Sequence, residues 1–138
     1  MKKILSLLLL LSGLSLSPAL AQKEGLRKET VSRVVPSGVN QRVLFSHHLN
    51  PDCSATEGHF NVRVVKPPEH GTVQTVSTMA FPYYEKDNIR AKCNQHKVKG
   101  IMVNYKSEAK YVGDDAVDLL VLFPTGHAWE MHIDISVR

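Results

Sequence analysis

An alternation with a period of two near the end of the chain constrains the fold most strongly. The stretch HAWEMHIDISV begins at His127 and places apolar and polar residues at alternating positions. The apolar set is Trp129, Met131, Ile133, Ile135 and Val137, and the polar set is Glu130, His132, Asp134 and Ser136. Successive side chains of a strand point to opposite faces, so the pattern predicts a strand with one buried face.

Six further runs have strand character and are separated by turn residues. They cover residues 30–35, 39–47, 59–65, 71–79, 100–105 and 116–123, and the breaks include Pro36-Ser37-Gly38, Pro67-Pro68 and Pro124-Thr125-Gly126. In the second run, alternation places Val39, Gln41, Val43 and Phe45 on one face. The run AVDLLVLF at 116–123 is almost entirely apolar, which predicts a central strand covered on both faces. About seven short strands with such turns indicate an all-β, antiparallel sandwich.

The first residues of the chain read as an export signal. Lys2 and Lys3 precede a long apolar run that ends at Ala19-Leu20-Ala21, the order of a secretory signal peptide with its cleavage site. We therefore expect residues 1–21 to be cleaved, 22–29 to be a flexible N-terminus and 30–138 to form one domain. No cysteine lies near the cut and no later stretch is long and apolar enough to span a membrane. The protein is predicted to be periplasmic or secreted, from a bacterium, without a lipid anchor.

The net charge excludes one class of partner. The chain has 17 lysines and arginines, and removing Lys2 and Lys3 leaves 15 against 13 acidic residues. A net charge of +2 on the mature chain is too small to indicate nucleic-acid binding.

Cys53 and Cys93 are the two cysteines of the chain. An even pair in an exported domain predicts a disulfide, with two buried free thiols as the alternative. Residues 80–98 interrupt the strand pattern and read as a long loop, with room for a short helical turn around Glu85–Lys92. Long loops in compact domains are either functional or tied down, and the disulfide would tie this one down.

Several motifs resemble the bacterial immunoglobulin-like and cadherin-like repeat modules. Tyr105 is followed by Tyr111, Gly113 and Asp115 in an aromatic-x-G-x-D pattern, and KPPEHGTV, with His70 and Gly71, is similar to a turn between two strands of such modules. The resemblance covers about 60–138, apart from the 80–98 loop, and extends to small single-domain exported proteins of unassigned function. It implies an Ig-like sandwich in which these residues and Trp129 are architectural. Lys106-Ser107 lacks the usual proline, and Val117 replaces the usual phenylalanine.

The 80–98 loop is the candidate binding surface, because binding residues concentrate on loops held by a rigid scaffold. Together with Lys99, just beyond its end, it contains the aromatic and basic residues Phe81, Tyr83, Tyr84, Lys86, Arg90, Lys92 and Lys97. Such a surface suits an acidic glycan or an envelope protein. The composition thus favours a non-enzymatic interaction or structural module of the bacterial cell envelope, with no cofactor.

Two metal sites are the alternatives. A periplasmic copper- or zinc-binding protein would gather His59, His70 and His96 from loops at one end of the sandwich. Calcium would use Asp114, Asp115 and Asp118, although their spacing is not that of an oxygen cage. The neighbours His47 and His48 are expected to point to opposite faces. Nucleophilic catalysis has little support, because no G-x-S-x-G motif is present and the cysteines pair with each other.

HAWEMH, residues 127–132, resembles the zinc-hydrolase motif H-E-x-x-H. In that motif the histidines are four apart and share one face of a helix. Here they are five apart on a predicted strand, so His127 and His132 should lie on opposite sides. Glu130, His132 and Asp134 are instead expected to form a charge cluster facing solvent.

Overall fold

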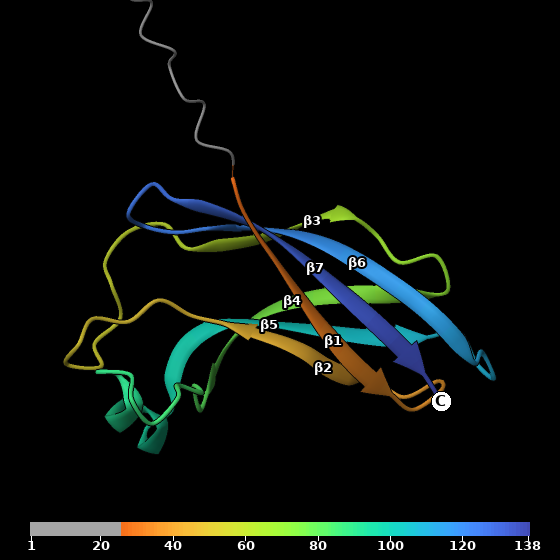
Figure 1. Cartoon of the computed structure of the whole chain (residues 1–138), viewed down its shortest axis with the longest axis horizontal. Coiled ribbons are helices and arrows are strands. Elements are labelled where there is room, and N and C mark those ends of the chain that lie inside the picture. The colour runs from red at the N-terminus through yellow and green to blue at the C-terminus, as the bar shows by residue number, and fades with distance from the viewer. Residues whose placement is uncertain (1–25) are drawn as a thin grey trace, which may run out of the picture.

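The computed structural model describes residues 26–138 and has seven strands in two facing sheets (Figure 1). The strands are β1 (Arg27–Val35), β2 (Gln41–Ser46), β3 (Asn61–Lys66), β4 (Gly71–Ala80), β5 (Val98–Ser107), β6 (Gly113–Leu122) and β7 (Ala128–Val137), with a 3-10 helix, η1 (Ala91–Gln95), before β5. One sheet has the order β1-β7-β6-β3 and the other β2-β5-β4. The predicted all-β sandwich is confirmed.

The N-terminal edge of the four-stranded sheet begins earlier than expected. β1 starts at Arg27 and runs parallel to β7, with Arg27 paired to Trp129, so residues 27–29 belong to the sheet and not to a flexible end. The other pairs of this sheet are antiparallel. The signal peptide expected at 1–21 lies outside the described residues. Among residues 26–138 no helix is long and apolar enough to cross a membrane.

The alternation in β7 is confirmed. Met131, Ile133 and Ile135 are at most 8 % exposed, whereas Asp134 between them is exposed to solvent. These buried side chains face the other sheet and contribute to a core that both sheets share. The amphipathic pattern therefore places β7 across one wall of the core.

The apolar run of β6 is central in its sheet, between β7 and β3, but it is not covered on both faces. Val117, Leu119 and Val121 are buried in the core. The alternate residues Ala116 and Leu120 are only partly buried. The prediction of two covered faces was wrong, because the residues on the outer face of β6 remain partly exposed to solvent.

A β-bulge in β2 overturns the expected face of Phe45. The register shifts between Arg42 and Leu44, so Val43 is an extra residue and Leu44 pairs with the core residue Val103. One inserted residue reverses the facing of every residue after it. Val43 is therefore buried in the core, whereas Phe45 lies on the outer face, with its ring against the backbone of Gly100.

A second, smaller hydrophobic cluster lies around Phe45. Its buried members are Leu49, Cys93 and Val98, and Phe45, Cys53 and Tyr84 pack against them. The segment from β4 to β5, which carries η1, thus folds over one end of the three-stranded sheet. In Figure 1 η1 lies at the lower left, beyond the ends of β2 and β5.

Candidate functional site

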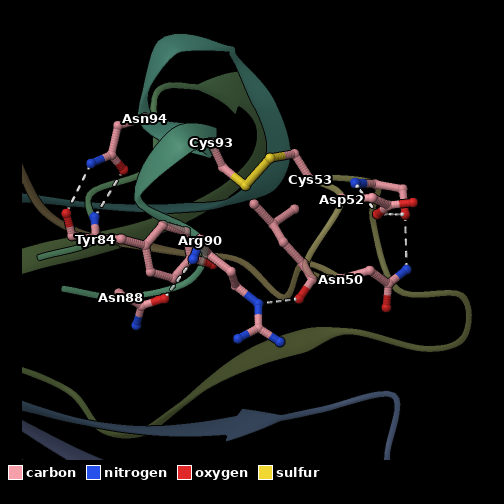
Figure 2. Close-up of a disulfide and its surroundings, with 10 residues drawn as sticks. Asn50, Asp52, Cys53, Tyr84, Asn88, Arg90, Cys93 and Asn94 are labelled. Carbon is pink, nitrogen blue, oxygen red and sulfur yellow. Dashed lines mark hydrogen bonds between the residues drawn. A yellow bond between two sulfur atoms is a disulfide. The ribbon is translucent and has the colours of Figure 1, made fainter. Parts of the chain in front are cut away.

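The disulfide between Cys53 and Cys93 is present and fixes the 81–97 loop against the segment that follows β2 (Figure 2). The two Cα atoms are 5.4 Å apart, within the ordinary range for a disulfide. Cys93 belongs to η1, which lies farther along the chain than the helical turn expected around Glu85–Lys92. The predicted disulfide-tied loop is therefore confirmed.

Side-chain hydrogen bonds complete the anchoring of this loop. The Tyr84 N–H donates to Oδ1 of Asn94 over 2.9 Å, and Nδ2 of Asn94 donates to the Tyr84 carbonyl over 2.8 Å. One amide side chain thus holds both backbone groups of Tyr84, as Figure 2 shows. The loop is ordered by these contacts rather than by strand pairing.

An open groove runs beside β2, which is an edge strand of its sheet. It consists of two adjoining hollows of about 350 and 430 Å³ that share Leu44, Phe45, His47 and Tyr83. The first hollow adds Arg33, Arg42 and Phe81, and the second adds Glu29, His48, Tyr84, Arg90, Phe123 and Trp129. We call this feature the β2 groove. It brings together both sheets and the disulfide-tied loop.

Aromatic contacts hold the loop side of the groove. The ring of His47 stacks on Phe45 and meets Tyr84 edge-on, with centroid separations of 5.3 Å in both pairs. Tyr83, next to Tyr84, is 77 % exposed, and Phe81 is 54 % exposed. Large aromatic side chains exposed beside an anchored loop are a feature of binding surfaces.

The opposite side of the groove contains a second aromatic set. His48 meets Phe123 at 5.3 Å, and Phe123 meets Trp129 at 4.7 Å between ring centroids. The Arg27 guanidinium lies 4.1 Å from the centre of the Trp129 ring. His47 and His48 thus point to different sides, as the sequence predicted for neighbours on an extended chain.

Both groove histidines are kept neutral at physiological pH. Burial lowers the pKa of His47, and burial together with the nearby Arg90 lowers the pKa of His48. Their Nδ1 atoms are buried and have no hydrogen-bond partner among residues 26–138. The imidazole rings therefore contribute aromatic surface to the groove, while their Nδ1 atoms are covered by the protein.

Three arginines give the groove a positive character. Within residues 26–138, no carboxylate lies within ion-pair distance of Arg33, Arg42 or Arg90. Glu29 also lines the groove, but its carboxylate is paired with Arg27 over 3.9 Å. The unpaired cations favour an anionic ligand.

The expected loop residues divide into two groups. Phe81, Tyr83, Tyr84 and Arg90 line the groove, whereas Lys86, Lys92, Lys97 and Lys99 do not. The Nζ atom of Lys97 lies 5.7 Å from the centre of the Phe81 ring, and Lys99 borders a separate hollow. Sequence reasoning missed the contribution of Arg33, Arg42, Phe123 and the two neighbouring histidines. Only the His47-His48 pair gives a local signal, because the other three come from distant strands and turns.

The residues with the family resemblance lie at the other end of the sandwich. Asp115 accepts hydrogen bonds from the N–H groups of Glu69 and His70, at 2.9 and 3.0 Å, and from the Tyr105 hydroxyl, at 2.9 Å. Burial alone would raise the pKa of Asp115, but these donors and the Ala116 N–H together lower it below its usual value. Asp115 therefore ties the turn before β4 to β5 and β6.

Glycines and rings surround this carboxylate. A Cβ on Gly71 would lie 2.6 Å from the Tyr105 ring, and Gly113 has a φ of +149°. The Tyr111 hydroxyl donates to the Asp114 carbonyl over 2.7 Å, and its ring stacks on His70. These contacts join the strands and turns of this corner, so the geometry of its residues is that of structural residues.

The calcium site expected at Asp114, Asp115 and Asp118 is not assembled. The two oxygens of Asp115 are bonded to the donors of the corner, whereas Asp118 contacts His132. Asp115 and Asp118 are three apart on β6, and this odd spacing places them on opposite faces of the sheet. The three carboxylates therefore cannot converge on one ion.

The alternative metal site at His59, His70 and His96 is not assembled either. His70 immediately precedes β4, and His96 is two residues before Val98, which pairs with Ala80 at the far end of β4. Ten residues of strand separate the two ends, a span of about 30 Å. Among residues 26–138 no group of three or more histidine, cysteine, aspartate or glutamate side chains is arranged to hold a metal.

In the HAWEMH stretch His127 immediately precedes β7, and Glu130 and His132 lie on the outer face of that strand as predicted. The His132 ring lies between Asp118 and Asp134, with 3.0 Å from Nε2 to Asp134, and Lys28 pairs with Glu130 over 2.8 Å. Hydrogen bonds to Asp118 and Asp134 raise the pKa of His132. This is a solvent-facing charge cluster and not a zinc-hydrolase site.

Fold and groove together define a disulfide-stabilised β-sandwich with an open aromatic groove at one sheet edge. No protein-family model matches the chain, and no curated protein matches it. A solved structure with some likeness is the solution structure of Amebosin, with a TM-score of 0.43 and 10% sequence identity over 83% of this chain and 99% of that one. A likeness at this level carries no argument about function.

Proposed function

We propose that the protein is an exported binding module of the bacterial cell envelope that recognises an acidic glycan in the β2 groove. It acts by binding and not by catalysis. We further propose that it is a bacterial immunoglobulin-like or cadherin-like module. Seven strands in sheets of four and three agree with that resemblance, although β1 joins β7 and not the sheet of β2.

One observation carries the proposal: exposed aromatic rings and unpaired arginines line the same groove, beside a loop held by a disulfide. Tyr83 and Phe81 are more than half exposed, and Arg33 and Arg42 line the same hollow. An ordered site loses little conformational entropy when a ligand binds. The groove is therefore prepared for a ligand that has both apolar surface and negative charge.

A glycan suits this groove better than a protein segment. Sugar rings have C–H groups on their faces and hydroxyls at their rims, so they pack on exposed aromatic rings while their hydroxyls stay hydrated. The groove is open, and neutral imidazole rings lie beside its aromatic side chains. A protein ligand added as a strand along β2 would need its free carbonyls, but Arg33 Nε already donates to the Val43 carbonyl over 2.8 Å.

Export is supported by the leader-like sequence at 1–21 and by the disulfide, which is typical of proteins that fold in an oxidising compartment. We place the protein in the periplasm or outside the cell.

Binding to polygalacturonate, with its fully methyl-esterified form as the uncharged control, tests the proposal. We expect the oxidised protein to be retarded by polygalacturonate in affinity electrophoresis and much less by the ester. Tyr83→Ala should weaken binding about tenfold, because an aromatic contact contributes about 0.5–1.5 kcal/mol beyond its buried area. A wild-type protein that binds neither polymer would overturn the proposal.

A second variant tests whether the groove is the site. Reversing charge at Lys92 and Lys97 alters the basic loop without changing a groove-lining residue. We expect this double variant to bind polygalacturonate more strongly than Tyr83→Ala does. The opposite order of affinities would show that the ligand binds the basic face of the loop and not the groove. Binding of poly-glutamate alone would indicate a protein partner.

A further inference from the structure

Arg90 is the cation that the disulfide-tied loop contributes to the β2 groove, and one edge of its guanidinium is anchored to the protein. Its Nε donates to the Leu49 carbonyl over 2.8 Å, and Leu49 is 2 % exposed. Figure 2 shows that the two terminal nitrogens of the guanidinium have no partner among the residues drawn. One edge of the planar group is therefore fixed to the protein while the other edge is free.

The backbone of Arg90 is fixed as well. Its N–H donates to Oδ1 of Asn88 over 2.9 Å, and its carbonyl accepts from the Cys93 N–H over 2.8 Å. Cys93 is in turn bonded to Cys53. The disulfide thus restrains the backbone from which the Arg90 side chain extends, and the bond from Nε to the Leu49 carbonyl holds the guanidinium itself.

Arg90 has no ion-pair partner within residues 26–138, and Glu29, the carboxylate that lines the same hollow, is paired with Arg27. Arg90 is partly buried and lines the second hollow with His48, Tyr84 and Trp129. The positive charge of Arg90 helps to lower the pKa of His48. It also counteracts the effect of burial, which raises the pKa of Tyr84. Both side chains line the second hollow, so the charge of Arg90 is felt by the residues of that hollow.

We propose that Arg90 is the carboxylate-binding residue of the groove. With its terminal nitrogens it takes the carboxylate of one uronic-acid residue as a bidentate pair, while the sugar ring packs against the neighbouring aromatic side chains. A partly buried, pre-positioned guanidinium matches a carboxylate in shape as well as charge, which an ammonium group does not. This assignment rests on the proposed function and adds the charge specificity of that site.

Isothermal titration of the oxidised protein with a short oligogalacturonate and with its methyl ester tests this assignment. Arg90→Gln should weaken binding of the charged oligomer at least tenfold and leave binding of the ester unchanged, because only the charged hydrogen bonds are lost. Arg90→Lys should recover only part of the affinity. Lys86→Gln, which removes the same charge from an exposed position outside the groove, is the matched control and should bind as wild type does.

A measurement on the wild-type protein keeps the test independent of how well the variants fold. The Nε–H resonance of Arg90 should shift on titration with the oligogalacturonate and not with the ester. If the wild type binds the oligogalacturonate but Arg90→Gln binds it equally well, or the Nε–H resonance does not move, the Arg90 assignment is wrong and the proposed function stands. If the wild type binds neither oligomer, the proposed function and the assignment fail together.

Discussion

Replacing Asp115 with alanine removes one carboxylate on which three donors from other segments converge. The donors are the N–H groups of Glu69 and His70 and the Tyr105 hydroxyl, and Asp115 is only 9 % exposed. A hydrogen bond to a charged group contributes about 1.5–3 kcal/mol, and water can replace part of what the two amides lose. We expect the free energy of unfolding to fall by about 3–5 kcal/mol, a large share of the roughly 5–15 kcal/mol of a typical domain.

Urea unfolding followed by the fluorescence of Trp129, the single tryptophan, measures this loss. Asp114→Ala is the matched control, because Asp114 is exposed and its carboxylate accepts only a 3.3 Å bond from Ser136; we expect a change within about 0.5 kcal/mol. A loss below about 1 kcal/mol for Asp115→Ala would refute the reasoning.

The same variant has a defined pH dependence. The pKa of Asp115 is lowered in the folded protein, so its contribution is full above the unfolded-state value and is lost as pH falls through the folded value. The stability difference between wild type and Asp115→Ala should therefore be constant near neutral pH and shrink below about pH 4. A difference that does not vary with pH would show that the charge of Asp115 is not what stabilises the corner.

Three further predictions concern the disulfide, a glycine and the charge cluster. Replacing Cys53 and Cys93 with serine should lower the free energy of unfolding by about 2–4 kcal/mol in urea denaturation, and an unchanged midpoint would contradict this. Gly100→Ala should destabilise the fold by about 2 kcal/mol or more, because the added Cβ would lie 2.5 Å from a backbone oxygen of β2. Gly126→Ala is the control: its Cβ would have open space, and we expect a loss of about 1 kcal/mol because of its φ of +85°. The reverse order of the two losses would refute the packing argument. The His132 ring should titrate in NMR above about pH 6.5. Its contacts with the carboxylates should add at most about 1 kcal/mol to the free energy of unfolding, since the side chain is 43 % exposed. This contribution should be full below about pH 6.5 and should be lost as pH rises through the folded pKa. A midpoint at or below 6.5 would contradict the carboxylate contacts.

Part of the candidate site was within reach of sequence reasoning. Tyr83, Tyr84 and Arg90 belong to a loop that interrupts the strand pattern and contains a cysteine, and both properties are local. The lysines of the same loop were expected to share the site, but none of them lines the groove. Composition identifies which residues a loop contains, whereas the contacts at Asn94 and the disulfide decide which of them face the groove.

The sequence by itself determined the strands, the turns and the cysteine pair, because each depends on neighbours along the chain. The period-two pattern of β7 is enough to place Ile133 and Ile135 in a core. Only the tertiary structure decided where the groove lies. The bulge at Val43 moves Phe45 to the outer face, and a shift of one residue leaves no mark in an alternating pattern. Trp129 lines the groove together with Phe45 and Tyr84, which are far from it in sequence, and such a juxtaposition depends on how the two sheets meet.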